Sequence, residues 1–362
     1  MVVGAVECRG FRNLAAARTP LGADVVVVHG PNGAGKTNLL EAVYFGLTGR
    51  SFRAGDDRDL IRYGDQRARV ELELEGGGEL LAALDRSGER RHLLSGRALS
   101  GDPGERPLVN VFHPDRLALV KAAPAHRRAH LDRLCGAIWP ARADLRRRFG
   151  RTLAQRNALV ARVRAGSGGA ESLASWDERL AAEAEPLIAA RADAVDTLAE
   201  PFSELGVRLG LDGAEVSYRP RAAGNATELA TELARRRAED LGRSYTSYGP
   251  QLDEVELRFG GRQLRRFASQ GQQRLALLAL LFAERAALLE AGRSAPLMLL
   301  DDVMSELDPA HRELLVSLLE RGGAGGQALI TATEAAQVPS TSALRIEVSE
   351  GSLANAPALR AA

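Results

Sequence analysis

The sequence predicts an α/β fold in which a mostly helical segment interrupts the α/β part of the chain. The valine-rich residues 25–29 have the composition of a strand buried on both faces, and a helix pattern follows directly. Further along, strand and helix patterns alternate again in "QLDEVELRF", "LALLALLFA", "APLMLLDD" and "QALITATE", as in an α/β core. Residues 126–200 show helical periodicity alone. We therefore expect an α/β domain from residues 1–115 and 246–362, and a helical second lobe from residues 116–245.

An antiparallel β subdomain is expected in the N-terminal part of the α/β domain. Residues 68–84 alternate between apolar and polar types, with Val70, Leu72 and Leu74 on one side. This alternation is typical of a half-buried antiparallel strand. A run of three glycines inside the segment would turn the strand back on itself.

Two long helices are expected in the interrupting segment. Apolar residues recur at helical spacing from Leu145 to Val163 and again from Leu173 to Leu198, with the glycine-rich "AGSGGAES" between them. This pattern is typical of an antiparallel helical hairpin. Pro201 would end the second helix, because proline lacks the backbone N–H that a helix interior needs.

Two shorter elements are expected after the helical hairpin. The stretch "VRLGLDGAEVSY" has the alternation of a β-hairpin, with Asp212 and Gly213 in its turn. Thr227 is expected to cap a further helix that ends near Leu241. Both elements would complete the second lobe.

The first part of the interrupting segment is strongly basic. Residues 121–165 contain twelve lysines and arginines but only two acids, a local balance of +10 in a chain of net charge +1. These side chains could pair with the acidic helix pattern at 171–204. Alternatively, they could contact the phosphate backbone of duplex DNA, which requires charge but no base code. Aromatic residues make up only 4% of the chain, which argues against base stacking on single strands as the main mode.

Composition limits the cellular setting. The 362 residues are 45% hydrophobic and 26% charged, which fits one large or two ordinary globular domains. Cys8 and Cys135 form no metal-binding pattern. The longest apolar run, Leu275–Ala283, is too short to span a bilayer, and the N-terminal stretch lacks the features of a signal peptide. We expect a cytoplasmic protein with no membrane partner.

A phosphate-binding loop is predicted directly after the valine-rich strand. "GPNGAGKT" (Gly30–Thr37) matches the pattern G-x-x-x-x-G-K-[ST] in full and lies between a strand and a helix. Its glycines allow positive φ angles that turn N–H groups toward an anion. Lys36 should reach the β- and γ-phosphates of ATP, and the Thr37 hydroxyl should bind Mg²⁺. The residues expected to contact ATP here are Gly30, Pro31, Asn32, Gly33, Ala34, Gly35, Lys36, Thr37 and Asn38.

Two carboxylates follow the apolar strand pattern "LMLL". Asp301 and Asp302 would lie at the carboxyl end of a buried strand, beside the phosphate loop. Asp301 is expected to hold Mg²⁺, and Asp302 could orient or deprotonate the attacking water. The alternative is that they only cap the helix pattern that starts near Ser305. Lys36, Asp301 and Asp302 are therefore candidate catalytic residues.

Several motifs together resemble those of the ATP-binding-cassette ATPases of the SMC and Rad50 type. "SQGQQR" (Ser269–Arg274) is similar to the cassette signature, and "DDVMSELD" to the combined magnesium-site strand and D-loop. "PDRLALVKAAPAHRRAHLD" (Pro114–Asp132), "ECRGFRNL" and "GPQLDEVEL" are similar to segments of the RecF family, and the similarity spans nearly the whole chain. Ala122, His130 and the "QL" at 251–252 depart from the family pattern, so the latter two positions receive no catalytic role.

The resemblance implies a cassette-type ATPase head and an intermolecular role for Ser269. In cassette ATPases the signature of one subunit closes on the ATP held by the other, which would assign Ser269, Gly271 and Gln272 to the nucleotide of a second copy. Ser269 would then also count among the catalytic residues. The alternative is that Ser269 only caps the apolar helix behind it. Ser305 and Asp308 would lie in the same dimer interface.

The resemblance assigns further residues to the nucleotide and its metal. Arg12 and Asn13 resemble residues that contact the nucleotide near the first strand. Gln66 is a candidate for the glutamine that senses Mg²⁺ in this superfamily, or is a solvated loop residue. Thr331 or Thr333 occupies the place of the switch histidine of transporters. Neither can titrate near neutral pH, which suggests slow hydrolysis.

By resemblance, the chain is expected to bind ATP and Mg²⁺, to form a homodimer on ATP, and to bind double-stranded or gapped DNA. Its expected pathway is the repair of gapped or stalled-fork DNA, helping to load RecA together with RecO and RecR. A transporter ATPase subunit shares some motifs but would lack the basic insert. An SMC or Rad50 head would carry far longer arms than the expected helices of about 30 residues, or about 45 Å. Whether Arg127 and Arg128 contact DNA, nucleotide or the head domain stays open.

Overall fold

The structure, a computed structural model, divides into two compact units. Unit 1 comprises residues 1–116 and 288–362, and unit 2 comprises residues 117–287; each is described by itself. The residues described are 2–22, 24–99, 108–113, 117–222, 224–320, 326–340 and 342–356. Within these ranges, no helix combines the length and the apolar character that crossing a membrane requires.

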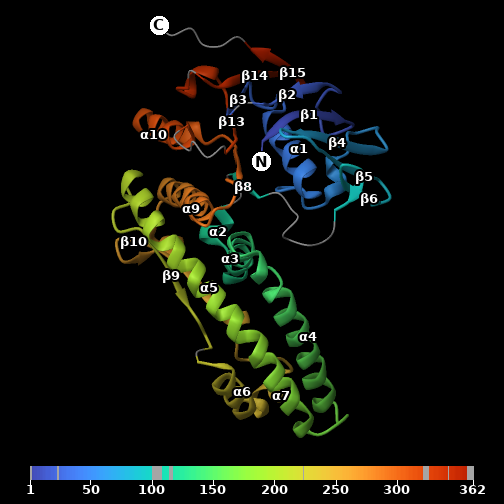
Figure 1. The fold of residues 1–362 in the computed structure, drawn as a ribbon, viewed down its shortest axis with the longest axis vertical. Coiled ribbons are helices and arrows are strands. Elements are labelled where there is room, and N and C mark those ends of the chain that lie inside the picture. The colour runs from blue at the N-terminus through green and yellow to red at the C-terminus, as the bar shows by residue number, and fades with distance from the viewer. Residues whose placement is uncertain are drawn as a thin grey trace. The chain divides into compact units, whose positions relative to one another are not determined.

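A mainly parallel sheet forms the centre of unit 1 (Figure 1), which confirms the predicted α/β class. Its strand order is β15-β14-β3-β13-β12-β8, and β15 alone is antiparallel to its neighbour. Neighbouring strands come from distant parts of the sequence, so that Val27 pairs with Ile330 and Val111 with Leu299. The five parallel strands therefore end at the same edge of the sheet. The strands are β3 (Val25–His29), β8 (Val109–Phe112), β12 (Leu297–Leu300), β13 (Ala328–Ala332), β14 (Leu344–Ser349) and β15 (Ser352–Ala356).

A second sheet of unit 1 is the expected antiparallel β subdomain. Its order is β2-β1-β4-β5-β6-β7. In β4, Ala68 and Val70 are buried while Arg69 between them is exposed, and Leu72 continues the buried side, as the alternation predicted. The glycine turn is also present, because Leu74 and Gly78 are hydrogen-bonded across it. The strands are β1 (Val3–Arg9), β2 (Arg18–Pro20), β4 (Arg67–Leu74), β5 (Glu79–Asp85), β6 (Arg90–Leu94) and β7 (Arg97–Ala98).

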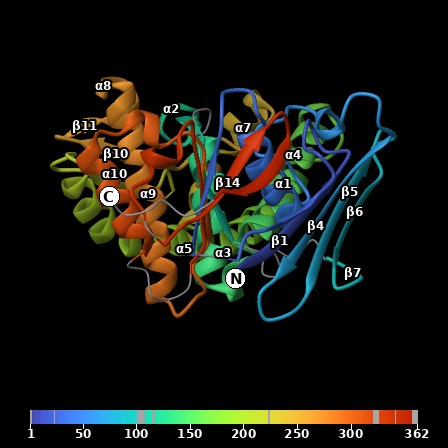
Figure 2. The same ribbon diagram turned by 90° about the horizontal axis from the view of Figure 1, so that it is seen from above.

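Helix α1 (Lys36–Thr48) lies between the two sheets of unit 1 (Figure 2). It packs against β4 and β5 on one side and against β13 on the other. Its Leu39, Leu40 and Val43 are fully buried and join Phe11 and Leu72 in one apolar cluster. This packing fixes the N-terminus of α1, which follows the phosphate loop. The other helices of unit 1 are α10 (Pro309–Glu320) and the short 3-10 helices η1 (Asp57–Leu60), η7 (Met304–Glu306) and η8 (Ala335–Gln337).

Unit 2 is mostly helical and contains the expected helical hairpin, formed by α4 and α5 (Figure 1). The two helices have 20 and 35 residues rather than about 30 each. The helices are α2 (Ala118–Lys121), α3 (Pro124–Ile138), α4 (Leu145–Arg164), α5 (Ala174–Arg208), α6 (Ala226–Arg235), α7 (Arg237–Arg243), α8 (Leu264–Phe267) and α9 (Gln270–Glu290), whose last residues belong to unit 1. Three short 3-10 helices accompany them: η4 (Pro140–Arg142), η5 (Ala170–Leu173) and η6 (Pro250–Leu252).

A three-stranded sheet of order β11-β10-β9 completes unit 2. It consists of β9 (Glu215–Arg219), β10 (Glu254–Phe259) and β11 (Arg262–Gln263). Because β10 pairs along its length with β9, residues 246–287 pack with unit 2, although the sequence placed them in the α/β domain. The assignment of these residues to a functional ATPase head stays a prediction.

Three local predictions in unit 2 are wrong. Helix α5 continues through Pro201, because Leu198, Phe202 and Leu205 keep its buried face intact. The expected β-hairpin does not form, since its first strand is the end of α5 and β9 pairs with β10 instead. The cap of α6 is Asn225, whose side chain accepts a hydrogen bond from the Glu228 N–H at 3.1 Å.

Candidate nucleotide-binding site

The phosphate loop leads into an open helix N-terminus. Gly35 is the N-cap residue of α1 with a φ of 119°, and no side chain caps this end. The first N–H groups of a helix lack partners within the helix and carry partial positive charge. Thr37 and Asn38 lie in this first turn. The helix end is therefore suited to binding a phosphate group, and the contacts of the individual loop residues with ATP stay a prediction.

Two glycines of the loop are required for different reasons. Gly30 has a φ of 147°, and a Cβ atom there would lie 2.2 Å from the backbone oxygen of Val348. Gly33 has a φ of 80°, but a Cβ atom there would meet no described atom within 4 Å. Gly30 is thus needed both for its backbone conformation and for close packing against β14, whereas Gly33 is needed for conformation alone.

We expect Gly30→Ala to destabilise the protein much more than Gly33→Ala. The first substitution forces a clash with backbone that cannot move away, which places it among severely destabilising core changes of about 3 kcal/mol or more. The second adds only the cost of a positive φ, about 1–2 kcal/mol. Urea unfolding of both variants measures the difference. Equal losses of unfolding free energy would contradict the packing role of Gly30.

The Lys36 side chain folds back onto the start of the phosphate loop. Its Nζ donates hydrogen bonds to the carbonyl oxygens of Gly30 at 2.7 Å and Pro31 at 3.0 Å. Partial burial lowers the pKa of Lys36, although the carboxylates of Asp302 and Asp301 act in the opposite direction. The Lys36 ammonium group therefore interacts electrostatically with Asp301 and Asp302, the two acids that were expected near it.

Thr37 and Asp301 meet at the end of the parallel sheet. The Thr37 hydroxyl lies 2.9 and 3.1 Å from the two carboxylate oxygens of Asp301. Asp301 directly follows β12 and is only 4% exposed. A hydroxyl and a carboxylate are hard oxygen donors of the kind that Mg²⁺ prefers. The two residues therefore fit the metal expected from the sequence, and their role as ligands stays a prediction.

Thr331 links the two aspartates. Its hydroxyl donates to a carboxylate oxygen of Asp301 at 2.8 Å and accepts from the Asp302 N–H at 2.7 Å. A hydroxyl has one proton to donate, and Thr331 gives it to Asp301. Thr333 accepts from the Gln337 side-chain amide at 2.9 Å and keeps its own proton for another acceptor. Of the two proposed switch residues, this geometry favours Thr333 for a phosphate contact.

Asp302 is held in an unusual conformation. It has a φ of 49°, which is uncommon outside glycine, and its side chain is exposed while Asp301 beside it is buried. The bond from its N–H to Thr331 fixes this backbone. The two adjacent carboxylates therefore occupy different environments, as their separate expected roles require.

His113 is a neighbour of Asp301 that the sequence analysis missed. Its Nε2 lies 3.5 Å from a carboxylate oxygen of Asp301, and its ring lies 5.4 Å from that of Phe52. It directly follows β8, which runs parallel to β12. The signal was present in "VNVFHP", where a polar residue ends an apolar strand as Asp301 does.

Arg12 and Asn13 lie at the edge of the phosphate loop. The Asn13 side-chain amide donates to the Ala34 carbonyl at 3.1 Å, and its oxygen accepts from the Asn38 side chain at 2.6 Å. Arg12 instead forms an ion pair with Glu41 of α1 at 3.0 Å. The structure thus brings both predicted residues to the loop, through partners that the sequence did not indicate.

Gln66 lies apart from the other candidate metal ligands. It precedes β4 with an exposed side chain, and its carbonyl accepts from the Arg86 N–H at 3.1 Å. Among the residues that the structure describes, the Gln66 side chain bonds neither to Thr37 nor to Asp301. Its role with Mg²⁺ stays a prediction, and the loop alternative agrees better with this position.

Ser269 caps helix α9 of unit 2 by a reciprocal arrangement. Its hydroxyl accepts from the Gln272 N–H at 3.2 Å, and its own N–H donates to the Gln272 side chain at 2.9 Å. This is a capping box, in which the side chain of each residue accepts a hydrogen bond from the otherwise unpaired backbone N–H of the other. The expected cap is confirmed, and it explains why Ser269 and Gln272 are spaced three apart.

Gly271 has no structural reason to be glycine within its own unit. Its φ is not positive, and a Cβ atom would meet only the Ser269 hydroxyl at 3.9 Å. Glycine in a helix costs roughly 0.5–1 kcal/mol relative to alanine. Alanine would therefore fit at this position in the single chain, and the contact of Gly271 with a second copy stays a prediction.

The residues expected in the D-loop lie beside the candidate catalytic acids in unit 1. The Ser305 hydroxyl donates to the Asp302 carbonyl at 2.9 Å. The Asp308 carboxylate caps α10 by accepting from the His311 N–H at 2.9 Å. This bond, and the one from the His311 side chain, lower the pKa of Asp308. Both side chains are exposed, so they are available to a partner.

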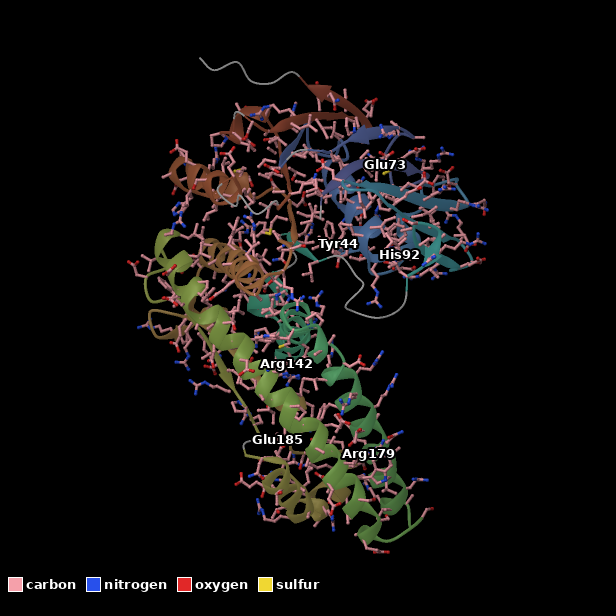
Figure 3. The ribbon with its side chains drawn as sticks, in the orientation of Figure 1. Tyr44, Glu73, His92, Arg142, Arg179 and Glu185 are labelled. Carbon is pink, nitrogen blue, oxygen red and sulfur yellow. The ribbon has the colours of Figure 1, made fainter. Side chains whose placement is uncertain are left out.

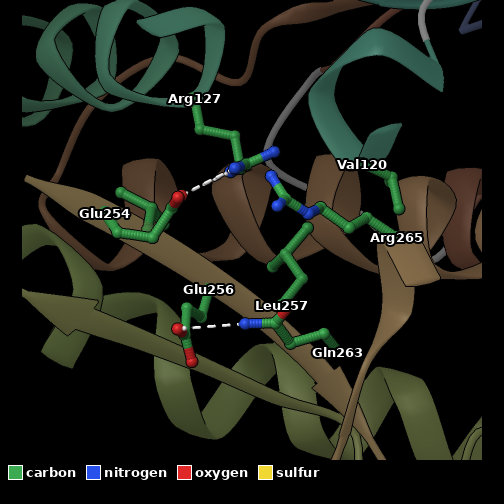
Figure 4. A pocket seen from close by; sticks show the side chains of 8 residues that line it. Val120, Arg127, Glu254, Glu256, Leu257, Gln263 and Arg265 are labelled. Carbon is green, nitrogen blue, oxygen red and sulfur yellow. Dashed lines mark hydrogen bonds and ion pairs between the residues drawn. The ribbon is translucent and has the colours of Figure 1, made fainter. Parts of the chain in front are cut away.

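The segment Pro114–Asp132, which resembles a segment of the RecF family, is hydrogen-bonded to another part of unit 2. This holds for its residues from Leu117 on, because Pro114, Asp115 and Arg116 lie outside the described residues. Arg127 donates to the Glu254 carboxylate at 2.6 Å (Figure 4) and to the Ala122 carbonyl at 2.8 Å. Arg128 donates to the Asp253 carbonyl at 2.6 Å. Both arginines thus join the segment "APAHRRAHLD" to "GPQLDEVEL", which accounts for residues whose role the sequence left open.

A buried ion network reinforces this junction. Arg191 of α5 donates to the Asp132 carboxylate at 2.7 Å and to the Asp253 carboxylate at 2.9 Å. All three side chains are at most 4% exposed. Buried pairs of this kind are strongly destabilising to break, because one charge is left uncompensated. The long helix α5 is therefore tied to α3 and to the start of β10.

Much of the basic segment is paired within unit 2. Arg142 lies 2.6 Å from Asp193, Arg148 lies 2.9 Å from Glu183, and the fully buried Arg156 lies 2.8 Å from Asp177. These three acidic partners belong to α5, as the pairing alternative predicted, whereas Arg147 pairs with Asp144 outside it. The side chains of Lys121, Arg151 and Arg162 are exposed and bond to no residue that the structure describes. Nitrogen-tipped side chains project outward along α4 (Figure 3).

Comparisons with known proteins find relatives over nearly the whole chain. Residues 2–350 match the family model for the RecF/RecN/SMC N terminal domain. The DNA replication and repair protein RecF of Heliobacterium modesticaldum is 36% identical over 333 residues, with 88% of this chain and 90% of the relative covered. The protein of that name from Anaeromyxobacter dehalogenans is 38% identical over 350 residues, with 91% of each covered.

Solved structures show the same likeness of fold. A structure of the recombination mediator protein RecF-ATP in the RecFOR pathway has a TM-score of 0.84 at 25% identity, with 98% of each chain covered. An Smc head bound to the C-winged helix domain of ScpA has a TM-score of 0.60 at 17% identity, with 98% of this chain and 97% of that chain covered, and shows similarity of fold alone.

Proposed function

Because the chain belongs to the RecF family, within the RecF/RecN/SMC group, we propose that it is an ATP-dependent DNA-binding protein of recombinational repair. The observation that carries the proposal is the meeting of Thr37 and Asp301 beside the open N-terminus of α1. Those groups suit a triphosphate with its metal, and a similar solved protein is described as RecF-ATP.

We assign the ATP site of one copy to the phosphate loop. The N–H groups of α1 and the Lys36 ammonium would bind the β- and γ-phosphates, and Thr37 with Asp301 would hold Mg²⁺. Bound Mg²⁺ would neutralise phosphate charge. The exposed carboxylate of Asp302 would orient the attacking water. Hydrolysis should be slow, because the threonine that replaces a switch histidine cannot act as a base near neutral pH.

We assign the other half of the site to Ser269 and Gly271 of a second copy. The capping box leaves Ser269 exposed at the start of α9, where its hydroxyl can donate to a phosphate oxygen. Gly271 leaves room for the approach. ATP would therefore join two copies head to tail, each phosphate loop closed by the partner's signature. Loss of γ-phosphate after hydrolysis would release them.

We assign DNA binding to the outer surface of α4 and its neighbours in unit 2. Helix α4 contains seven arginines and no acid. The side chains of Arg151 and Arg162 bond to no described residue, and in the surface pairs of Arg147 and Arg148 the arginine side chain is more than half exposed. Exposed ion pairs are weak, so phosphates can displace their acidic partners. By likeness to its relatives, the protein would act with RecO and RecR on gapped or stalled-fork DNA and help to load RecA.

We expect DNA affinity to fall steeply with salt and to vary little with sequence. Each neutralised phosphate contributes about −0.9 to the slope of log K against log salt on duplex DNA. Arg151→Ala and Arg162→Ala together should reduce the steepness of that slope by about 2. Fluorescence anisotropy with a labelled duplex from low to moderate salt measures this.

The control for the DNA experiment is Arg179→Ala. Arg179 lies on the acidic helix α5 and stacks on Trp176 at 5.5 Å, so its loss should leave the slope unchanged. A DNA affinity that does not change with salt would contradict the phosphate-contact model. A normal slope in the double variant would place the contacts elsewhere on the protein.

A further inference from the structure

The C-terminal β-hairpin of unit 1 lies directly against the phosphate loop. Its strand β14 is the neighbour of β3, the strand that leads into the loop (Figure 1), and β15 pairs back along β14. A Cβ atom on Gly30 would lie 2.2 Å from the backbone oxygen of Val348 in β14. The first glycine of the loop is therefore packed on the backbone of the hairpin.

The turn of this hairpin contacts the other end of the loop. Its two central residues are Glu350, with a φ of 50°, and Gly351, with a φ of 81°, as in the tight turns that require a positive φ at both positions. Glu350 is exposed, but Gly351 is buried. The Gly351 N–H donates to the Ala34 carbonyl at 2.8 Å, and the Gly351 carbonyl accepts from the Ala15 N–H at 2.8 Å. The turn is thus bonded both to the phosphate loop and to the segment between β1 and β2.

Two donors from outside the loop hold the Ala34 carbonyl. Besides the Gly351 N–H, the Asn13 side-chain amide donates to the same oxygen at 3.1 Å. In a planar trans peptide the C=O and the N–H point in opposite directions, so the N–H of Gly35 is turned away from these two donors. This N–H forms no hydrogen bond with any residue that the structure describes. It directly precedes the open N-terminus of α1, and it is available to a phosphate oxygen there.

No side chain fits between the turn and the loop. A Cβ atom on Gly351 would lie 1.9 Å from the backbone oxygen of Asn13, so a larger residue would push the turn away from Ala34. The turn between β6 and β7 has the same backbone, with a φ of 47° at Ser95 and 79° at Gly96. There, a Cβ atom on Gly96 would meet no described atom within 4 Å. The close approach distinguishes Gly351 from a glycine that only its turn requires.

We propose that the β14–β15 turn is a positioning element of the ATP site: the Gly351 N–H holds the Ala34 carbonyl and thereby keeps the Gly35 N–H directed at the phosphates of the nucleotide. Asn13 provides the second hold on the same carbonyl. The N–H groups of such loops cradle the α- and β-phosphates, so the turn matters equally for ATP and ADP. The proposal rests on the proposed function, since it concerns the same site. Asn13 was expected there as a direct contact, whereas Gly351 was given no role.

The test is the binding of fluorescent ATP, ADP and adenosine analogues to wild type and Gly351→Ala. In the variant, the affinities for ATP and ADP should each fall about 10- to 100-fold, as for the loss of one hydrogen bond to a charged group. Adenosine binding should stay unchanged. Unchanged ATP affinity, under conditions where urea unfolding shows the variant to be folded, would overturn the proposal. An equal loss for all three ligands would also overturn it, because it would indicate a merely structural role.

Gly96→Ala is the matched control. It places alanine at nearly the same positive φ in a two-residue turn of the same kind. It should lose folding stability through backbone strain but bind ATP like wild type. Equal losses of ATP affinity in Gly96→Ala and Gly351→Ala would show that strain in a turn accounts for the effect, and would overturn the proposal. Failure of wild type to bind ATP would instead overturn the proposed function.

A second variant decides the case if Gly351→Ala fails to fold. Glu350→Asn relieves strain at the first turn position, because asparagine tolerates a positive φ better than glutamate, and by itself it should leave ATP affinity unchanged. Added to Gly351→Ala, it should restore folding but not the affinity for ATP or ADP, because the close contact with Asn13 remains. Full ATP affinity in the double variant would overturn the proposal.

Discussion

Replacing Lys36 with methionine should abolish measurable ATP hydrolysis and weaken ATP binding by at least about 100-fold. Each hydrogen bond between charged groups is worth about 1.5–3 kcal/mol, and Lys36 would make two to the phosphates. Methionine keeps the volume of the side chain. It removes only the bonds from Nζ to the Gly30 and Pro31 carbonyls, which solvent can replace. The fold should therefore survive the change.

Thermal unfolding and isothermal titration together check this result. The unfolding temperature without nucleotide should stay within a few degrees of wild type, while the stabilisation that ATP confers on wild type should vanish. Unchanged steady-state hydrolysis in Lys36→Met would show that the phosphate loop is not the active ATP site.

Replacing Ser269 with arginine should leave ATP bound by the single chain but block ATP-induced pairing. Ser269 lies in unit 2 at the exposed start of α9, and its loss costs the folded chain about 1 kcal/mol of capping. A long cation at this position would obstruct the approach of a second copy. Pairing should weaken by at least about tenfold, since mismatched groups in an interface cost several kcal/mol.

Gly271→Ala is the matched variant for this prediction. The added methyl group meets only the Ser269 hydroxyl at 3.9 Å, so the single chain should gain roughly 0.5–1 kcal/mol of stability. Pairing should nevertheless weaken if another molecule must approach there. Light scattering with ATP measures both variants. Normal ATP-induced dimers of Ser269→Arg would refute the intermolecular role of the signature.

The sequence predicted well those features that depend on neighbouring residues. The valine-rich strand, the phosphate loop and the acids after "LMLL" were placed correctly, because each combines a strand pattern with a polar residue at its end. A helix cap at Ser269 was likewise among the expectations, although its reciprocal bonding with Gln272 was not. Such patterns are local and require no knowledge of the pairing of distant strands.

Features that depend on distant contacts could not be predicted. The sequence did not single out Glu41, because its partners Arg12 and Arg53 reach it only in the fold. His113 reached Asp301 only because β8 pairs with β12. Pro201 was expected to end α5, but the packing of the helix face on both sides of it outweighed the missing hydrogen bond.

The division of the chain was the least predictable feature. Residues 246–287 were assigned to the α/β domain because their strand and helix patterns are typical of an α/β core. The pairing of β10 with β9 and the bonds of Arg127 and Arg128 to residues 253–254 draw the segment into unit 2. The bonds of the two arginines join residues more than a hundred positions apart, and no local pattern indicates them or the strand pairing.

The central claim is that each ATP is bound between the phosphate loop of one copy and the signature of another. Light scattering of an equimolar mixture of Lys36→Met and Ser269→Arg, with ATP, tests it most directly. Neither variant should pair by itself, under conditions where wild type does. In the mixture, the intact phosphate loop of Ser269→Arg can meet the intact signature of Lys36→Met, so one complete site forms and ATP-dependent dimers should appear. Absence of dimers from the mixture would contradict the claim.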